Sequence, residues 1–253
     1  MTIAPSIAWQ WMELHDSVSL YAVERKVRRS VSLKQWQLHR CPCLHPQLLL
    51  APANEGRLHR AAWSGSLEQV KALLNFRIPV ACQNSQGWTP LHHASFCGHQ
   101  PLVKFLLHRG TDINSRDFFN CTPLHRATWN GQAQTAEYLL QHGASHAIRT
   151  CSGQTPLHLA AANGHGNVAR TLLEHKVRVD CKDINRWSPL HWASFNGNLD
   201  IIDLLLSNGG TVNEKNNNGM TPLQLAVLAE SICLGKVQIS ILSVLDWMTL
   251  KPI

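Results

Sequence analysis

This 253-residue chain contains 15 histidines and eight cysteines, side chains that can ligate a metal ion or take part in catalysis. Their densest group is the run His39-Arg40-Cys41-Pro42-Cys43-Leu44-His45, where two thiols and two imidazoles could ligate a metal ion. Structural zinc sites, however, use pairs of ligands separated by a longer segment, and this run lacks that spacing. We therefore predict no metal site and no cofactor.

Patterns that mark catalytic sites are also missing from the sequence. It contains no glycine-rich phosphate-binding loop, no Gly-x-Ser-x-Gly and no His-Glu-x-x-His. No pair of carboxylates can be assigned to acid–base chemistry either. We expect neither enzymatic activity nor a small-molecule substrate.

Five of the histidines belong to a six-residue signature, Thr-Pro-Leu-His-x-Ala, that recurs with a period of about 33 residues and without an insertion. A constant period of this length is typical of stacked repeat proteins. The first copy keeps only the phase and the last has glutamine for histidine. The copies are Gly56–Ala61, Thr89–Ala94, Thr122–Ala127, Thr155–Ala160, Ser188–Ala193 and Thr221–Ala226.

Each position of the signature has a physical role in placing two helices. Thr or Ser can accept a hydrogen bond at the start of a helix, and Pro suits the first helical position. The small alanine lets neighbouring helices approach closely, and the leucine points into the seam between repeats. A glycine then permits a left-handed turn before a second apolar stretch, and Asp, Asn and Gly favour a hairpin after it. The predicted unit is helix, turn, helix and hairpin.

These residues resemble the ankyrin repeat, and the resemblance covers about four-fifths of the chain. It implies an all-α fold, an ankyrin-repeat solenoid of about six helix-turn-helix repeats with projecting hairpin loops. Arg77, Lys176 and Arg186 replace glycines that the pattern expects, which predicts locally less regular turns. The pattern ends at Glu230, where another helix-ending glycine belongs.

The period predicts three parts of the chain. Residues 1–54 are expected to be a poorly ordered N-terminal extension, and residues 231–253 an irregular apolar capping segment. Residues 55–230 hold the repeats, of which the last is only the start of a sixth. Their expected bounds are 55–87, 88–120, 121–153, 154–186, 187–219 and 220–230.

The resemblance implies a scaffold or adaptor that binds a partner protein through the concave surface of first helices and hairpin tips. It also implies that the signature histidines hydrogen-bond backbone groups near the hairpins. Packing does not dictate the residues just after each signature, where aromatic and basic side chains gather. Such side chains favour a binding strip, although the rings could instead pack against neighbouring hairpins. The predicted partner-binding residues are Arg60, Trp63, Trp88, His93, Phe96, Phe118, Phe119, Arg126, Trp129, Trp187, Trp192 and Phe195.

Two other functions are alternatives. A substrate-recognition adaptor of a ubiquitin ligase would carry a recruiting box near the C-terminus, and no matching pattern is found there. A nucleic-acid-binding regulatory protein could stack bases on aromatic rings. The formal net charge is +7, but the basic residues form no dense block. The charge therefore does not by itself indicate that the chain binds nucleic acid. We expect an unidentified protein partner and no nucleic acid.

The remaining features bear on location and regulation. Scattered cysteines suit a reducing compartment, and no apolar run approaches the ~18 residues of a membrane span. We therefore expect the chain to be in the cytoplasm, or the nucleus, without membrane insertion. We also expect a monomer. The basic cluster Arg25–Arg29 could be a solvated segment or a nuclear-import signal. Because it precedes Ser30 and Ser32, these are candidate phosphorylation sites.

Overall fold

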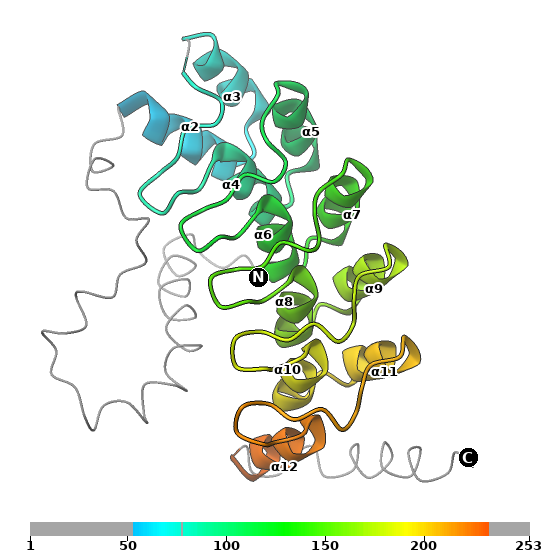
Figure 1. The fold of residues 1–253 in the computed structure, drawn as a ribbon. Coiled ribbons are helices and arrows are strands. Elements are labelled where there is room, and N and C mark those ends of the chain that lie inside the picture. Colours follow the sequence, from blue (N-terminus) through cyan, green and yellow to red (C-terminus); the bar gives the residue numbers. More distant parts are fainter. Residues whose placement is uncertain (1–52, 77, 233–253) are drawn as a thin grey trace, which may run out of the picture. The chain divides into compact units, whose positions relative to one another are not determined.

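The computed structural model describes residues 53–76 and 78–232, which lie in one compact unit. These residues form helices and turns without a β-strand, which confirms the predicted all-α fold (Figure 1). The helices are α2 (Ala53–Trp63), α3 (Leu67–Leu74), α4 (Pro90–Cys97), α5 (Gln100–His108), α6 (Pro123–Trp129), α7 (Ala133–Gln141), α8 (Pro156–Asn163), α9 (Gly166–Glu174), α10 (Pro189–Asn196), α11 (Leu199–Ser207) and α12 (Pro222–Ile232).

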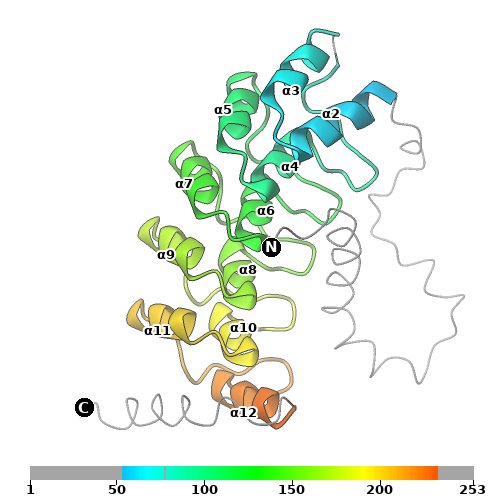
Figure 2. The ribbon, with the colours of Figure 1, turned by 180° about the vertical axis from the view of Figure 1, so that it is seen from behind.

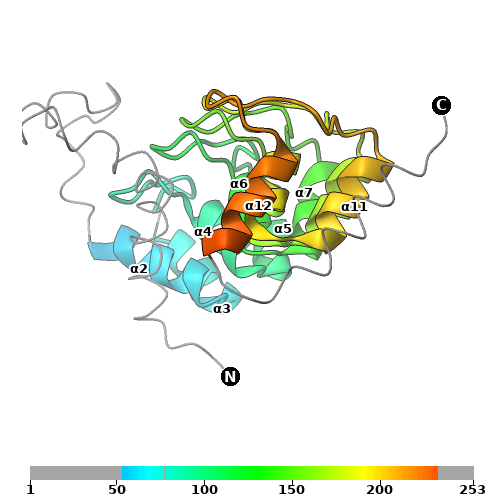
Figure 3. The same ribbon diagram turned by 90° about the horizontal axis from the view of Figure 1, so that it is seen from below.

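The helices form two rows. The first row contains α2, α4, α6, α8, α10 and α12, in which each helix packs against the next (Figure 1). The second row contains α3, α5, α7, α9 and α11, and each of these packs against the first-row helix that precedes it (Figure 2). The loop after each second-row helix returns to the first row as a hairpin. Figure 3 shows the hairpins gathered along one edge of the stack.

The signature determines where the first-row helices begin. The N-cap residues Thr89, Thr122, Thr155 and Ser188 have extended backbones, and each is followed by proline at the first helical position. Proline has no N–H to leave unpaired there, and its fixed φ suits a helix. A left-handed glycine then ends the helix, as at Gly98, whose φ is 78°.

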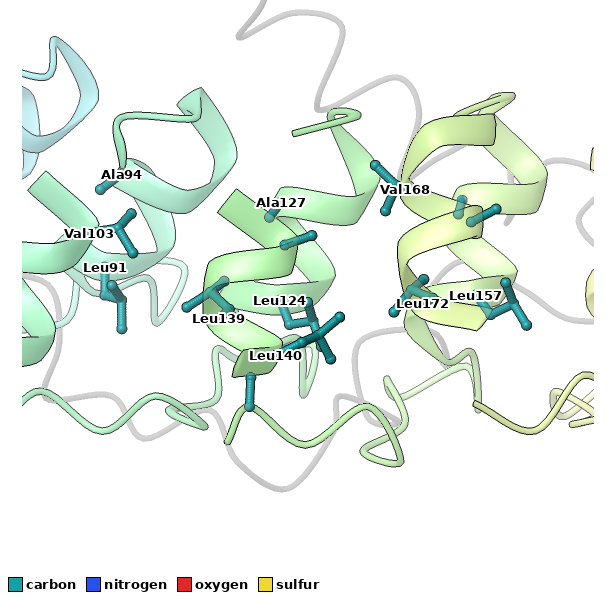
Figure 4. Close-up of a cluster of buried hydrophobic side chains, with 14 of the residues drawn as sticks. Leu91, Ala94, Val103, Leu124, Ala127, Leu139, Leu140, Leu157, Val168 and Leu172 are labelled. Carbon is teal, nitrogen blue, oxygen red and sulfur yellow. The ribbon is translucent and has the colours of Figure 1, made fainter. Parts of the chain in front are cut away.

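The signature leucines and alanines form the seam between repeats, as predicted. The leucines from Leu58 to Leu190 are at most 3% exposed, and the signature alanines at most 6%. Side chains of the second row, such as Leu139 and Leu172, fill the space between the rows (Figure 4). Each such leucine stabilises the fold by about 1.5–3 kcal/mol when it is buried.

Neighbouring hairpins are joined through their backbones. The N–H of Phe118 donates to the carbonyl of Gln86 at 3.2 Å, and the N–H of Cys151 donates to the carbonyl of Phe119 at 2.9 Å. The equivalent bond recurs at each of the next two hairpins. The spacing of the repeats is therefore fixed at the hairpin tips as well as between the helices.

The expectation of less regular turns is wrong for Lys176 and Arg186. Their φ values of 56° and 59° lie in the same left-handed region as those of Gly143 and Gly153, the equivalent residues one repeat earlier. Both N–H groups still donate to the carbonyl three residues earlier, at 2.9 Å. A side chain in this conformation costs about 1 kcal/mol, which the surrounding turn contacts offset. Arg77 lies outside the described residues.

The two ends of the stack differ from the expected bounds. Helix α2 begins at Ala53, inside the expected N-terminal extension, and α12 continues through Glu230 to Ile232. A helix continues there because Glu230 does not offer the left-handed turn that glycine gives earlier repeats. Leu223 on α12 is 38% exposed, unlike the buried signature leucines before it.

The buried seam makes a direct prediction about stability. Replacing Leu124, which is fully buried between repeats, with alanine should lower the free energy of unfolding by about 2–5 kcal/mol. Urea denaturation followed by circular dichroism measures this change. The exposed control Glu137→Ala should change it by less than about 0.5 kcal/mol. Equal effects of the two substitutions would contradict the assigned packing.

Candidate partner-binding surface

Three signature histidines, His92, His158 and His191, connect a first-row helix to the following hairpin. In α4 and α8, Nδ1 of His92 and His158 accepts from the N–H of the N-cap threonine at 3.1 Å. The threonine hydroxyl lies 2.8 Å from the same nitrogen. On the other side of the ring, Nε2 donates to the carbonyl of Cys121 at 3.0 Å or of Trp187 at 3.1 Å, 29 residues later. These bonds to backbone near the hairpins confirm the expected scaffold role.

This arrangement requires neutral imidazole rings that carry their hydrogen on Nε2. Burial lowers the pKa of His92 and His158 to about 4, and that of His125 to about 3. At His125, Nε2 lies near the carbonyl of Gln154 but outside hydrogen-bond geometry. In His92 and His158 both ring nitrogens are engaged with the scaffold. These two rings therefore have no nitrogen available for a metal ion or a substrate.

Three residues that were expected to face a partner are buried, so this expectation is wrong for them. Trp88, His93 and Arg126 are 1%, 3% and 6% exposed. The guanidinium of Arg126 lies 4.3 Å from the centroid of the Trp88 ring, and its Nε donates to the Asp117 carboxylate at 3.0 Å. The ring centroids of His93 and Trp88 are 4.9 Å apart. The three side chains stabilise the stack.

The residue after a signature histidine folds back onto the hairpin residue nine positions earlier. Arg126 contacts Asp117 in this way, and Trp192 Nε1 donates to Asp183 Oδ2 at 3.1 Å. The same carboxylates close their hairpins, since each also accepts backbone N–H groups of the turn through Oδ1. Burial raises the pKa of Asp183. Arg126 and Asp117 carry opposite charges and are nine positions apart, and from this feature of the sequence their contact could have been predicted.

The aromatic residues after the alanines are half-buried at the first row. Trp63 stacks on Phe96 with ring centroids 5.5 Å apart, so packing between repeats accounts for part of their burial. Phe195 meets Trp187 edge to face at 5.4 Å. Trp129 makes no ring contact within the described part of the chain, and it remains half-buried.

Three other predicted contact residues lie in the repeats of α2 and α10. Arg60 is exposed on α2. Trp187 and Trp192 are half-buried, with ring centroids 4.7 Å apart. Some of the predicted side chains are therefore buried, others stack on a neighbouring ring, and others are open to solvent.

Two hairpin tips carry exposed apolar side chains close to the first row. Phe119 is 45% exposed, whereas Phe118 is half-buried over Gly87, where a Cβ would approach the Phe118 backbone nitrogen to 2.8 Å. Ile184 is 63% exposed and was missing from the predicted set. It is two periods after Phe118, so the repeat register was the signal that could have identified it.

The described residues contain no cluster of candidate metal ligands. Within 53–76 and 78–232, no three His, Cys, Asp or Glu side chains come together as metal ligands. Burial raises the pKa of the Cys82 thiol to about 12 and that of Cys97 to about 11, which keeps both protonated at neutral pH. The run His39–His45, Ser30 and Ser32 lie outside the described residues.

Comparison with protein families identifies the family of this chain. The family model for ankyrin repeats (three copies) matches residues 44–117, 115–183, 142–216 and 176–237. The chain therefore belongs to the ankyrin repeat family. A search of curated proteins found no match. Ankyrin repeats are generally protein–protein interaction modules and are typically non-enzymatic. Across the described residues, no helix combines the length and the hydrophobicity needed to cross a membrane.

The buried histidines predict an acid-sensitive fold. Their pKa values are about 3–4 in the folded chain and near 6.5 when unfolded. As the pH falls from 6.5 to 4, the unfolded chain therefore binds more protons and gains stability relative to the folded chain. Each histidine should lower the free energy of unfolding by about 1.4 kcal/mol per pH unit in this window. Urea denaturation at several pH values measures this decrease in the free energy of unfolding.

A natural substitution supplies the control for this pH dependence. Gln224 occupies the histidine position of the last repeat, where its Oε1 accepts from the N–H of Thr221 at 2.9 Å. A His125→Gln variant should therefore keep the helix cap and show a shallower fall in stability between pH 6.5 and 4. An unchanged slope would show that His125 does not titrate as its burial requires.

The buried pair of Arg126 and Asp117 gives a second stability prediction. Asp117→Ala removes the hairpin acceptor and leaves a buried guanidinium without its carboxylate, so we expect a loss of about 3–5 kcal/mol. Asp117→Asn retains the turn acceptor, as Asn84 does one repeat earlier, and should cost less. Thermal unfolding of both variants checks this order, and the reverse order would contradict it.

Proposed function

We propose that this chain is a non-enzymatic scaffold or adaptor, which binds a partner protein through its first-row helices and hairpin tips. This face corresponds to the concave surface expected from the ankyrin resemblance. The observation that carries the proposal is the partial exposure of aromatic rings at one repeat position, beside the exposed tips of the hairpins. Trp63, Phe96, Trp129 and Phe195 supply the rings.

Several of these rings already have neighbours within the chain, so they do not contribute equally. Trp63 and Phe96 stack on each other, and Phe195 packs on Trp187. Trp129 has no such ring contact in the described part, and Phe119 is 45% exposed at a tip of the neighbouring hairpin. These two side chains are therefore the best candidates for residues whose burial drives association.

Physical chemistry supports this assignment. Large apolar side chains that remain open to water cost free energy, and they are common where proteins bind one another. Tryptophan in particular is enriched among the few residues whose truncation weakens an interface most. A shallow row of such rings on a rigid stack suits a protein surface, and the chain is proposed to act as a monomer when it binds.

The proposal predicts that Trp129→Ala combined with Phe119→Ala abolishes partner capture. Both side chains are at least partly exposed, so the urea denaturation curve should remain cooperative and lose at most about 1 kcal/mol of stability. Tagged wild-type and variant chains are compared by affinity capture followed by mass spectrometry. The amount of each partner that the variant retains should be at least tenfold lower than with wild type. This corresponds to a loss of about 1.4 kcal/mol of binding free energy.

The matched control for this experiment lies on the second row. Glu174→Ala combined with Arg170→Ala alters two exposed residues of α9 and should leave capture unchanged. Trp63→Ala is less informative, because it also removes the stacking on Phe96. If the double variant of Trp129 and Phe119 captured the same proteins as wild type, this face would not be the binding surface.

A further inference from the structure

A second candidate surface lies on the second row, away from the first-row face. A shallow hollow of about 620 Å³ lies between α5 and α7, which neighbour each other in Figures 1 and 2. These two helices pack together less closely than α7 and α9. Lys104, Phe105, Leu107, His108, Tyr138 and His142 line it.

The aromatic part of this hollow is particular to these two repeats. Phe105 and Tyr138 occupy equivalent positions in successive repeats. The same position holds Ala72, Thr171 and Leu204 in the other second-row helices. The repeat pattern therefore does not require rings here. Both rings are half-buried, and they form the apolar floor together with Leu107.

Lys104 lies at the rim of the hollow, and its Nζ is 5.1 Å from the centroid of the Tyr138 ring. A second cation, Arg109, is outside the lining but close to it, since its guanidinium lies 5.2 Å from the centroid of the Phe105 ring. Within the described residues neither cation forms an ion pair. His142 stacks on Tyr138 at 3.9 Å and donates from Nδ1 to its carbonyl at 2.8 Å. The nearest acidic residue along α7, Glu137, is not part of the lining.

We propose that this hollow binds an acidic, amphipathic segment of a separate protein. Its carboxylates would pair with Lys104 and Arg109, and an apolar side chain would lie on Phe105 and Tyr138. The hollow is short and has no row of cations that could follow a phosphate backbone, which disfavours nucleic acid. This site is independent of the first-row face proposed above.

Charge also argues against an occupant from the same chain. Residues 1–54 contain six basic and three acidic residues, and residues 233–253 contain two lysines and one aspartate. Neither segment offers the negative charge that the rim would attract. A second copy, with its formal net charge of +7, would be repelled from a basic surface.

The test measures binding of a defined peptide to the full chain. The probe is a fluorescein-labelled peptide of about 15 residues, rich in Glu and Asp, with leucines at helical spacing. Fluorescence anisotropy should detect binding that weakens as salt is added. Lys104→Glu combined with Arg109→Glu should reduce affinity at least about tenfold, and Tyr138→Ala should also reduce it severalfold.

The controls separate this site from its alternatives. Arg170→Glu reverses an exposed charge at the position equivalent to Lys104 and should leave affinity within about twofold. The variant of Trp129 and Phe119 should bind the probe normally. Equal affinity of the charge-reversed variant and wild type would overturn the proposal. So would tighter binding of a single-stranded oligonucleotide, or sedimentation showing that wild type, but not the charge-reversed variant, forms dimers.

Discussion

His92, His158 and His191 each form hydrogen bonds in two repeats at once, and the regularity of the stack depends on these bonds. One ring nitrogen accepts from the N-cap of its own helix, and the other donates to a hairpin carbonyl 29 residues later. Because Nδ1 accepts a hydrogen bond only while the ring is neutral, protonation of the histidine would break its bond to the helix start. Each repeat therefore depends on its neighbour, as expected for a linear array.

The last described repeat differs from the earlier ones at the histidine position. Gln224 keeps the cap on Thr221 through its side-chain oxygen. Leu223 is more exposed than its equivalents in the earlier repeats. Gln224 and Glu230 replace the signature histidine and the helix-ending glycine in this repeat.

The sequence predicted the helix starts, the buried seam and the scaffold role of histidine, because each depends on contacts that recur once in every repeat. It did not predict the burial of Arg126, which depends on a side chain reaching the Asp117 hairpin. The left-handed conformation of Lys176 also escaped prediction, because the surrounding turn overrides its local preference. The hollow between α5 and α7 depends on how closely two helices pack, which the repeat pattern alone does not specify.

The central claim is that buried signature residues form the scaffold while exposed rings beside them bind a partner. Site-specific photocrosslinking in cells tests it most directly, with a crosslinking amino acid at the position of Phe119 or, on the second row, of Glu174. We expect partner adducts at position 119 that disappear when Trp129→Ala is added, and none at position 174. Equal adducts at both positions, unaffected by Trp129→Ala, would contradict it.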